Sequence, residues 1–278
     1  MFKNVLVGVD GRPNGRDAIA LASRLRDPDG KLTLAHVHHG EMAKEREDSR
    51  KLLEEERKGA DVKAELISVL AASPGRGLHQ QAEEQGADLL VVGSCSHGAF
   101  GRAMLGDDTR AALNGSPCAV AIASLAYAAH PTPITKVGVA YNGSPESKAA
   151  LAVAQELAAP SGATVCALEV VSIPSIAYTG IVAPALGQSI DAMLQEASSR
   201  MTELSDVEGR AVYGLAGEEL AAFGEEVDIL VVGSRGYGPV RRLVLGSTSD
   251  FLGRHARCSL LILPRGAHSG VSDSATGS

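Results

Sequence analysis

The sequence predicts two tandem α/β domains, each built on a doubly wound, mainly parallel sheet of five strands. Three observations lead to this prediction. Short apolar runs alternate with helical patterns along the chain. The runs carry few charges, as do strands buried on both faces of a parallel sheet. The whole alternation then occurs a second time, which indicates two homologous domains in one chain.

The first half contains five strand patterns and the helices between them. We expect strands at 3–9, 32–37, 65–70, 87–93 and 119–123. Helices are expected after Asn14 as N-cap, over 41–60, over 77–86 and around 110–114. The segment 41–60 is highly charged with mixed signs at helical spacing, which is typical of a solvated helix with i,i+4 ion pairs.

The second half repeats this order. Its strands are expected at 136–140, 163–171, 210–213, 227–233 and 259–263, with helices at 146–159, 191–204 and 217–224. Ser144 as N-cap with Pro145 at the first helical position is a strong helix start. A further helix is expected to begin at Ser247, with Asp250 completing a capping box.

Matching residues align the two halves. In this alignment Asp10 corresponds to Asn142 and Pro13 to Pro145. The sequence VVGS occurs at the end of the fourth strand of each half. We therefore expect one domain over 1–125 and a second over 134–265. The tail, 266–278, is small and polar, and we expect it to be disordered.

Composition narrows the classes of partner. Hydrophobic residues make up 45% and charged residues 21%, as in a soluble globular chain. The net charge of −7 argues against nucleic acid, whose binding needs a basic face. The longest weakly polar run, 117–129, is too short for a membrane span, and the start of the chain lacks the apolar core of a secretory signal.

The four cysteines form no CxxC pair. Cys95, Cys118, Cys166 and Cys258 are therefore expected to be reduced thiols in a cytoplasmic protein. Cys95 also offers a possible redox role, against the simpler interpretation of a loop residue.

The stretch after the strand 227–233 carries the clearest functional pattern. Gly233, Gly236 and Gly246 are spaced by two and nine residues, and Ser247 and Thr248 follow at the start of a helix. Glycines allow the backbone to approach an anion, and a helix N-terminus offers free N–H groups and a positive dipole end. The pattern predicts a phosphate-binding loop, in which Arg235 is a candidate phosphate contact. A purely structural loop before a capped helix is the alternative.

Other chemistries find less support. His36 and His38 share one face of a strand, but no carboxylate or Cys motif accompanies them, so we predict no metal site. We find no nucleophile constellation and no Walker lysine after the glycine loop. No catalytic residue is therefore assigned, and fast phosphoryl transfer is not expected.

These residues together resemble the universal stress protein family in its tandem two-domain form. The resemblance covers nearly the whole chain. It rests on Asp10-Gly11, on His36-Val37, on the segment 86–94, and on the glycine loop that ends at Gly246-Ser247. It implies a Rossmann-like fold similar to the adenine-nucleotide α-hydrolase superfamily. It also implies dimeric pairing through the last strand, as a homodimer or an intrachain pseudo-dimer, and ATP binding, with or without Mg²⁺, in members that keep the loop.

Applied to the second half, the resemblance implies an intact nucleotide site. In the family, the acidic residue after the first strand and the backbone of the HV valine hold adenosine, and the loop holds ribose and phosphates. The matching residues here are Asn142, Val170, Gly233, Arg235, Gly236, Gly246, Ser247 and Thr248. Asn142 departs from the usual Asp, which weakens this contact without removing its hydrogen-bonding capacity.

The first half departs at the other end of the site. It keeps Asp10, Val37, Gly93 and Gly106, but Ser96 replaces the second glycine, and Asp107-Asp108 replaces Ser-Thr. Two carboxylates at a helix N-terminus occupy the anion site and repel phosphates. We therefore predict nucleotide binding in the second half and a degenerate site in the first.

Three functions remain open at this point. The first is a stress-response regulatory protein that binds ATP or a related adenine nucleotide, with slow or no hydrolysis. The second is a nucleotide-independent interaction scaffold. The third is a weak ATPase or a redox-active enzyme.

Overall fold

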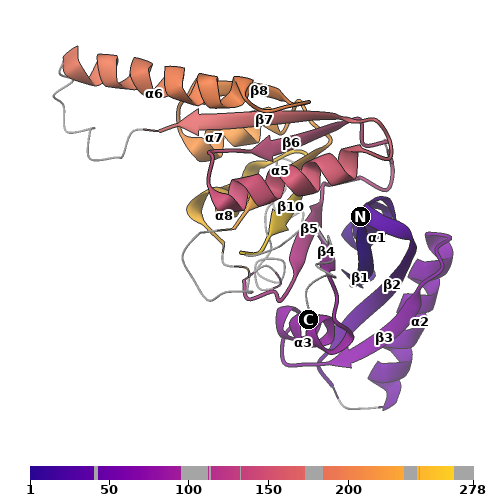
Figure 1. Ribbon diagram of the computed structural model, residues 1–278. Coiled ribbons are helices and arrows are strands. Elements are labelled where there is room, and N and C mark those ends of the chain that lie inside the picture. The colour runs from indigo at the N-terminus through magenta and orange to yellow at the C-terminus, as the bar shows by residue number, and fades with distance from the viewer. Residues whose placement is uncertain are drawn as a thin grey trace, which may run out of the picture.

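The computed structural model describes residues 1–40, 43–94, 112, 114–131, 133–172, 184–234, 243 and 245–265, with the side chains of 184–189 left aside. Ten strands form one continuous sheet in the order β3-β2-β1-β4-β5-β10-β9-β6-β7-β8. Figure 1 shows helices on both faces of this sheet, with α2 and β3 at one end of the molecule and α6 and β8 at the other. The predicted α/β class with two parallel units is confirmed.

The first half supplies five strands in the order β3-β2-β1-β4-β5, all parallel. Its elements are β1 (Phe2–Gly8), α1 (Pro13–Leu25), β2 (Arg26–His38), α2 (Ala43–Gly59), β3 (Glu65–Leu70), α3 (Pro74–Gln85), β4 (Leu89–Gly93) and β5 (Ala119–Ala123). The chain order reverses between β1 and β4, and this switch point opens a crevice at the carboxyl ends of the strands.

The second half repeats the same winding in parallel pairs. Its elements are β6 (Lys136–Ala140), α5 (Pro145–Ala158), β7 (Thr164–Val171), α6 (Pro184–Thr202), β8 (Glu208–Tyr213), α7 (Ala216–Phe223), β9 (Ile229–Gly233), α8 (Ser247–His255) and β10 (Ser259–Leu263). Its switch point lies between β6 and β9.

The halves join through their last strands. β5 and β10 pair antiparallel, with Leu261 opposite Ala121, and this is the one antiparallel pair among the described strands. The pairing through the last strand that the family resemblance implied therefore occurs within one chain. It makes the molecule an intrachain pseudo-dimer.

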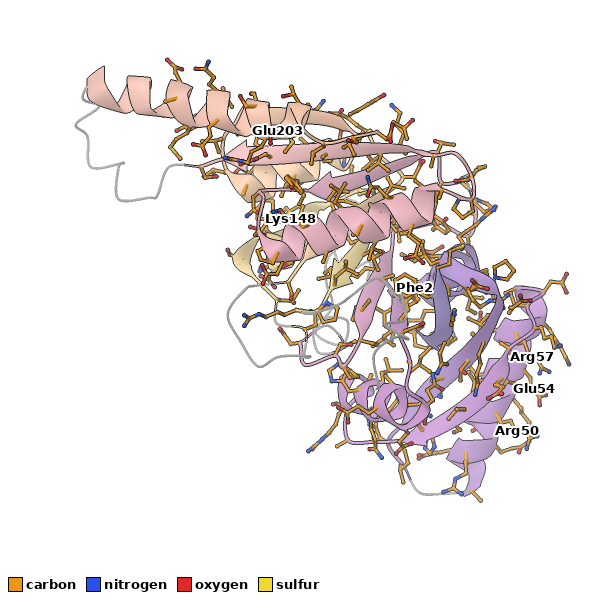
Figure 2. All side chains as sticks on the ribbon, in the orientation of Figure 1. Phe2, Arg50, Glu54, Arg57, Lys148 and Glu203 are labelled. Carbon is orange, nitrogen blue, oxygen red and sulfur yellow. The ribbon has the colours of Figure 1, made fainter. Side chains whose placement is uncertain are left out.

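Alternate strand residues supply the two apolar layers. Val5 and Val7 belong to the layer that includes residues of α1, α2, α5 and α6, whereas Leu6 belongs to the layer on the other face, which includes residues of α3, α7 and α8. Both layers continue across the β5–β10 junction. The outer side of α2 is solvated as predicted, with i,i+4 ion pairs such as Arg50–Glu54 at 3.6 Å (Figure 2).

The connection between the halves is held by a buried carboxylate. Asp17 on α1 accepts hydrogen bonds from the backbone N–H groups of Ala126, at 3.0 Å, and Ala128, at 2.8 Å. Ionised acceptors make the stronger class of hydrogen bond. The segment between the two predicted domains is therefore fastened to the first half through Ala126 and Ala128.

Two predicted N-caps are wrong. Arg12, not Asn14, is the N-cap of α1, because Pro13 takes the first helical position with its fixed φ. Gly246, not Ser247, is the N-cap of α8, and its N–H donates to Ser249 Oγ at 3.1 Å, so Asp250 is not the capping-box partner. Ser247 and Thr248 therefore occupy the first two helical positions.

No helix within the described ranges is long and apolar enough to cross a membrane. In the same part of the chain, no group of three or more His, Cys, Asp or Glu residues is placed to hold a metal ion.

Candidate functional site

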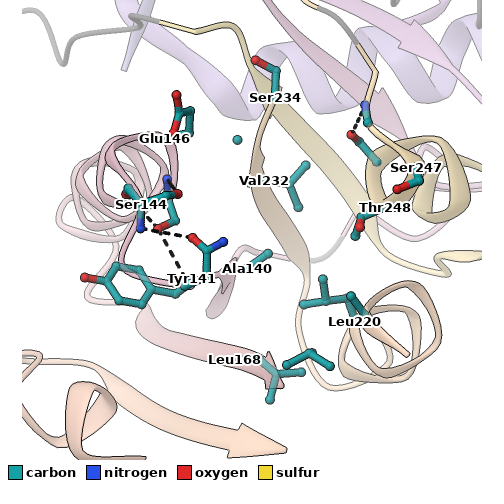
Figure 3. Close-up of a pocket in the computed structure, with 17 residues that line it drawn as sticks. Ala140, Tyr141, Ser144, Glu146, Leu168, Leu220, Val232, Ser234, Ser247 and Thr248 are labelled. Carbon is teal, nitrogen blue, oxygen red and sulfur yellow. Dashed lines mark hydrogen bonds between the residues drawn. The ribbon is translucent and has the colours of Figure 1, made fainter. Parts of the chain in front are cut away.

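A cavity of about 410 Å³ opens at the carboxyl ends of the strands in the second half (Figure 3). Its walls come from the ends of β6, β7 and β9 and from the first turns of α5, α7 and α8. Among the residues predicted for the site, those that line it are Asn142, Val170, Gly233, Gly246, Ser247 and Thr248. Arg235 and Gly236 lie outside the described residues.

The turn between β6 and α5 fixes Asn142. Gly143 takes a φ of +76°, which favours glycine, and Ser144 caps α5 by accepting the Ser147 N–H at 3.2 Å. Asn142 Oδ1 accepts the Ser144 N–H at 3.1 Å. Its Nδ2 has no partner among the described residues, so this amide can donate to a group in the cavity.

The backbone of Val170 also faces the cavity. Every second residue of β7 turns its N–H and C=O toward β6, and Leu168 is one of these, because its C=O accepts the Tyr141 N–H at 3.0 Å. Val170 turns to the same side, but β6 has ended at Ala140. The side of Val170 that β6 would cover thus has no strand neighbour in the described part of the chain, so its N–H and C=O are available to a ligand.

Gly233 has a packing role that its place in the glycine pattern did not reveal. A Cβ at Gly233 would lie 2.9 Å from Glu146 Cβ and 3.0 Å from the Glu146 carbonyl oxygen. The equivalent Gly93 is tighter still, with Asn14 O at 2.1 Å. Both glycines therefore let the first turn of a helix approach the strand end, and Gly233 shapes the cavity by placing α5 there.

The first turn of α8 forms the opposite wall. Figure 3 shows Ser247 and Thr248 across the cavity from Ser144 and Glu146. The side chain of Ser247 is exposed and that of Thr248 is half-buried. Since the first N–H groups of a helix lack intrahelical partners, this wall presents N–H donors, two hydroxyls and a positive dipole end.

The structure adds residues that the sequence did not predict as site residues. They include Ser144, Glu146 and Ser234 among the polar ones and Leu168, Leu220 and Val232 among the apolar ones. Ser234 directly follows the strand ending VVG that occurs in both halves, and this repeated sequence could have identified it as a site residue. No sequence pattern indicated Glu146 as a site residue. Its carboxylate lies 3.7 Å from Arg265 Nε.

An ion pair between Arg200 and the buried Glu169 joins α6 to the end of β7. Glu169, which precedes Val170, accepts from Arg200 Nη2 at 2.6 Å and from Arg200 Nε at 3.3 Å. Hydrogen bonds to Glu169 raise the pKa of Arg200 above its ordinary value. This bidentate contact fixes the end of β7.

In the first half, the corresponding positions carry different groups. Asp10 Oδ1 accepts the Arg12 N–H at 3.0 Å, and Val37 extends past the end of β1 as Val170 does past β6. Gly93 ends β4, followed by the buried Ser94, whose hydroxyl has no hydrogen-bond partner among the described residues. Gly106, Ser96, Asp107, Asp108 and Cys95 lie outside the described residues.

His36 takes the place of Glu169 in this half. Its Nδ1 lies 2.9 Å from Ser49 Oγ on α2, and the Ser68 hydroxyl donates to the same oxygen at 2.8 Å. Burial, followed by the nearby His38, lowers the pKa of His36, and Asp10 partly offsets this. The histidine is therefore part of a packed polar network between β2, β3 and α2.

Comparison with known proteins gives one consistent result. The model of the universal stress protein family matches residues 1–124 and 133–264. A universal stress protein of Mycobacterium tuberculosis is 28% identical over 76% of this chain and 72% of its own length. One from Thermus aquaticus is 31% identical over 45% of this chain and 95% of its own.

A solved structure supports the same fold. The universal stress protein of Archaeoglobus fulgidus aligns with a TM-score of 0.69 at 20% identity, over 95% of this chain and 98% of its own.

Proposed function

Because the chain belongs to the universal stress protein family, we propose that its second half binds an adenine nucleotide in the cavity between β6, β7 and α8. The ligand is ATP or a close relative, with or without Mg²⁺. The proposal rests on two features that lie on two walls of one cavity. One wall presents the backbone N–H and C=O of Val170, which have no strand neighbour in the described part of the chain, and the other presents the helix N-terminus at Ser247 and Thr248.

The adenosine part fits the wall formed by β6 and β7. Val170 N–H and C=O supply a donor and an acceptor for the edge of the base, while Leu168 and Leu220 supply apolar surface. Asn142 Nδ2 donates to the ribose or base. A volume of about 410 Å³ is within the range of small-ligand pockets.

The phosphates fit the wall formed by α8. Gly246 brings the backbone close, and the N–H groups and hydroxyls of Ser247 and Thr248 bind the oxygens. Gly236 and Arg235 complete this part of the proposed site.

We assign a regulatory role to binding, with slow or no hydrolysis, in a cytoplasmic stress-response protein. Glu146 is the one carboxylate among the described residues that line the cavity, and it lies beside Arg265. A carboxylate engaged in this way is a poor general base for water. The free thiols of Cys118, Cys166 and Cys258 agree with a reducing compartment.

The two halves, 1–125 and 134–265, thus have different roles in the proposal. The acidic Asp107-Asp108 pair of the first half takes the place of Ser247-Thr248, and it disfavours phosphates in the degenerate site.

Titration of the full chain with ATP tests the proposal. Replacing Ser247 with Ala and Thr248 with Val together is expected to weaken ATP binding at least about tenfold, because two hydrogen bonds to a charged ligand are lost. Adenosine affinity should change less. Thr202→Val, which removes a hydroxyl at the far end of α6, serves as the control. If ATP neither binds the wild-type chain nor raises its melting temperature, the proposal is wrong.

A further inference from the structure

The chain that leads into the proposed phosphate wall is held by the other half of the molecule. Leu243 and Leu245 precede Gly246, the N-cap of α8. Gly115 N–H donates to the Leu243 carbonyl at 2.9 Å, and Leu243 N–H donates to the Ser116 carbonyl at 2.9 Å. This is a two-bond bridge between segments from different halves.

A third contact comes from a side chain. Asn114 Oδ1 accepts the Leu245 N–H at 3.2 Å, one residue before the N-cap of α8. The Leu243 side chain is fully buried in the same apolar layer as Ala112 and Cys118 of the first half. Backbone and side-chain contacts therefore fix the same short segment, Leu243 and Leu245, which we call the limb.

The anchoring segment is itself rigid. Gly115 adopts a φ of +92°, a conformation that side-chain-bearing residues rarely take. The buried Ser116 donates its hydroxyl to the Cys118 carbonyl at 3.1 Å, just before β5 enters the central sheet. The limb is thus tied to the junction of the two halves rather than to an independent loop.

The repeat places different residue types at the positions equivalent to Asn114 and Gly115. With Gly106 opposite Gly246, Asn114 stands opposite Arg254, and Gly115 opposite His255. Arg254 pairs with Asp250 inside α8, and His255 Nδ1 lies 2.9 Å from the Phe251 carbonyl. Asn114 and Gly115 therefore differ in residue type from their counterparts, whose recorded contacts lie within α8.

We propose that Asn114, Gly115 and Ser116 are positioning residues of the second-half nucleotide site. They hold Leu243 and Leu245 so that the N–H groups of α8 already point toward the phosphate position before the ligand arrives. Pre-organisation of this kind increases affinity because less ordering remains to be done on binding. The first half, whose own phosphate loop is acidic, thereby serves as a structural partner of the functional site. This inference rests on the proposed function of that site.

Amide hydrogen exchange of the ligand-free full chain tests the anchor itself. Asn114→Ala is expected to speed exchange of the Leu245 N–H at least about fivefold, the effect of one lost hydrogen bond. Asn114→Asp keeps the accepting oxygen and should restore slow exchange, which a general packing defect at this position would not do. Unchanged exchange in Asn114→Ala would overturn the anchor.

ATP titration of the same proteins tests the positioning role. Asn114→Ala should bind ATP about fivefold more weakly, and Gly115→Ala roughly tenfold more weakly, because it strains the bridge. Gly86→Ala is the matched control: Gly86 has a φ of +61° at the end of α3, with open space around it, and no contact with the limb is recorded for it. It should lose stability but keep wild-type affinity.

The two readouts separate the two proposals. Faster exchange in Asn114→Ala together with unchanged ATP affinity would refute the positioning role while leaving nucleotide binding intact. Absence of ATP binding by the wild type would instead refute the proposed function, and the exchange measurement would still decide whether the anchor exists.

Discussion

A carboxylate placed at position 248 should abolish nucleotide binding without weakening the fold. Thr248→Asp imports the residue that stands at the equivalent position 108 of the first half. Thr248 occupies the first turn of α8 and lines the cavity. A unit charge about 4 Å from a phosphate, at an effective dielectric constant of about 20, costs about 4 kcal/mol, or roughly a thousandfold in affinity.

The same charge acts favourably on the helix. An acidic residue in the first turn interacts with the positive end of the helix dipole and stabilises it by about 0.5 kcal/mol. We therefore expect the urea midpoint of Thr248→Asp to equal or exceed that of the wild type, while isothermal titration shows no ATP binding. A loss of affinity without a loss of stability identifies repulsion rather than unfolding.

Thr248→Asn is the matched control, because it has the shape of Asp and no charge. It should bind ATP far more tightly than Thr248→Asp does. Equal affinities of the Asp and Asn variants would refute the reasoning, since the phosphates would then lie away from α8.

Three further predictions concern other parts of the molecule. Asp17→Asn should lower the free energy of unfolding by about 2 kcal/mol in urea titrations and expose the linker to proteases, because a buried ionised acceptor of two N–H groups is lost. Burial lowers the pKa of His36, so the unfolded chain binds the proton more readily than the folded chain does. The free energy of unfolding is therefore higher above pH 6.5, and this extra stability is lost as the pH falls through the pKa of the folded state. His36→Asn should therefore reduce the decrease in urea midpoint between pH 7 and pH 5. An unchanged pH dependence of the midpoint would contradict this prediction. Burial raises the pKa of Cys118 to about 11, so peptide mapping should show slow iodoacetamide labelling of this thiol at pH 8 and fast labelling only in urea.

Much of the strand framework could be predicted from the sequence because its signals are local. The runs 65–70, 119–123, 136–140 and 259–263 match the observed strands at both ends. Each is a short run in which apolar residues predominate. The repeat then placed Asn142, Val170 and Gly233 at equivalent strand ends, and these ends line one cavity.

Features that depend on packing were not predictable in this way. The capping box of α8 joins Gly246 and Ser249, whereas the sequence pattern indicated Ser247 with Asp250. Glu146 enters the cavity only because α5 packs closely on Gly233. The contact of Asn114 with Leu245 joins residues far apart in the chain, and no local pattern encodes it.

Photoaffinity labelling of the intact chain with an azido derivative of ATP tests the central claim most directly. Peptide mapping would locate the label, and competition with unmodified ATP would establish specificity. We predict a single label per chain, confined to peptides from 134–265 and lost in Thr248→Asp. Labelling of peptides from 1–125, or two labels per chain, would contradict the assignment of the nucleotide to the second half.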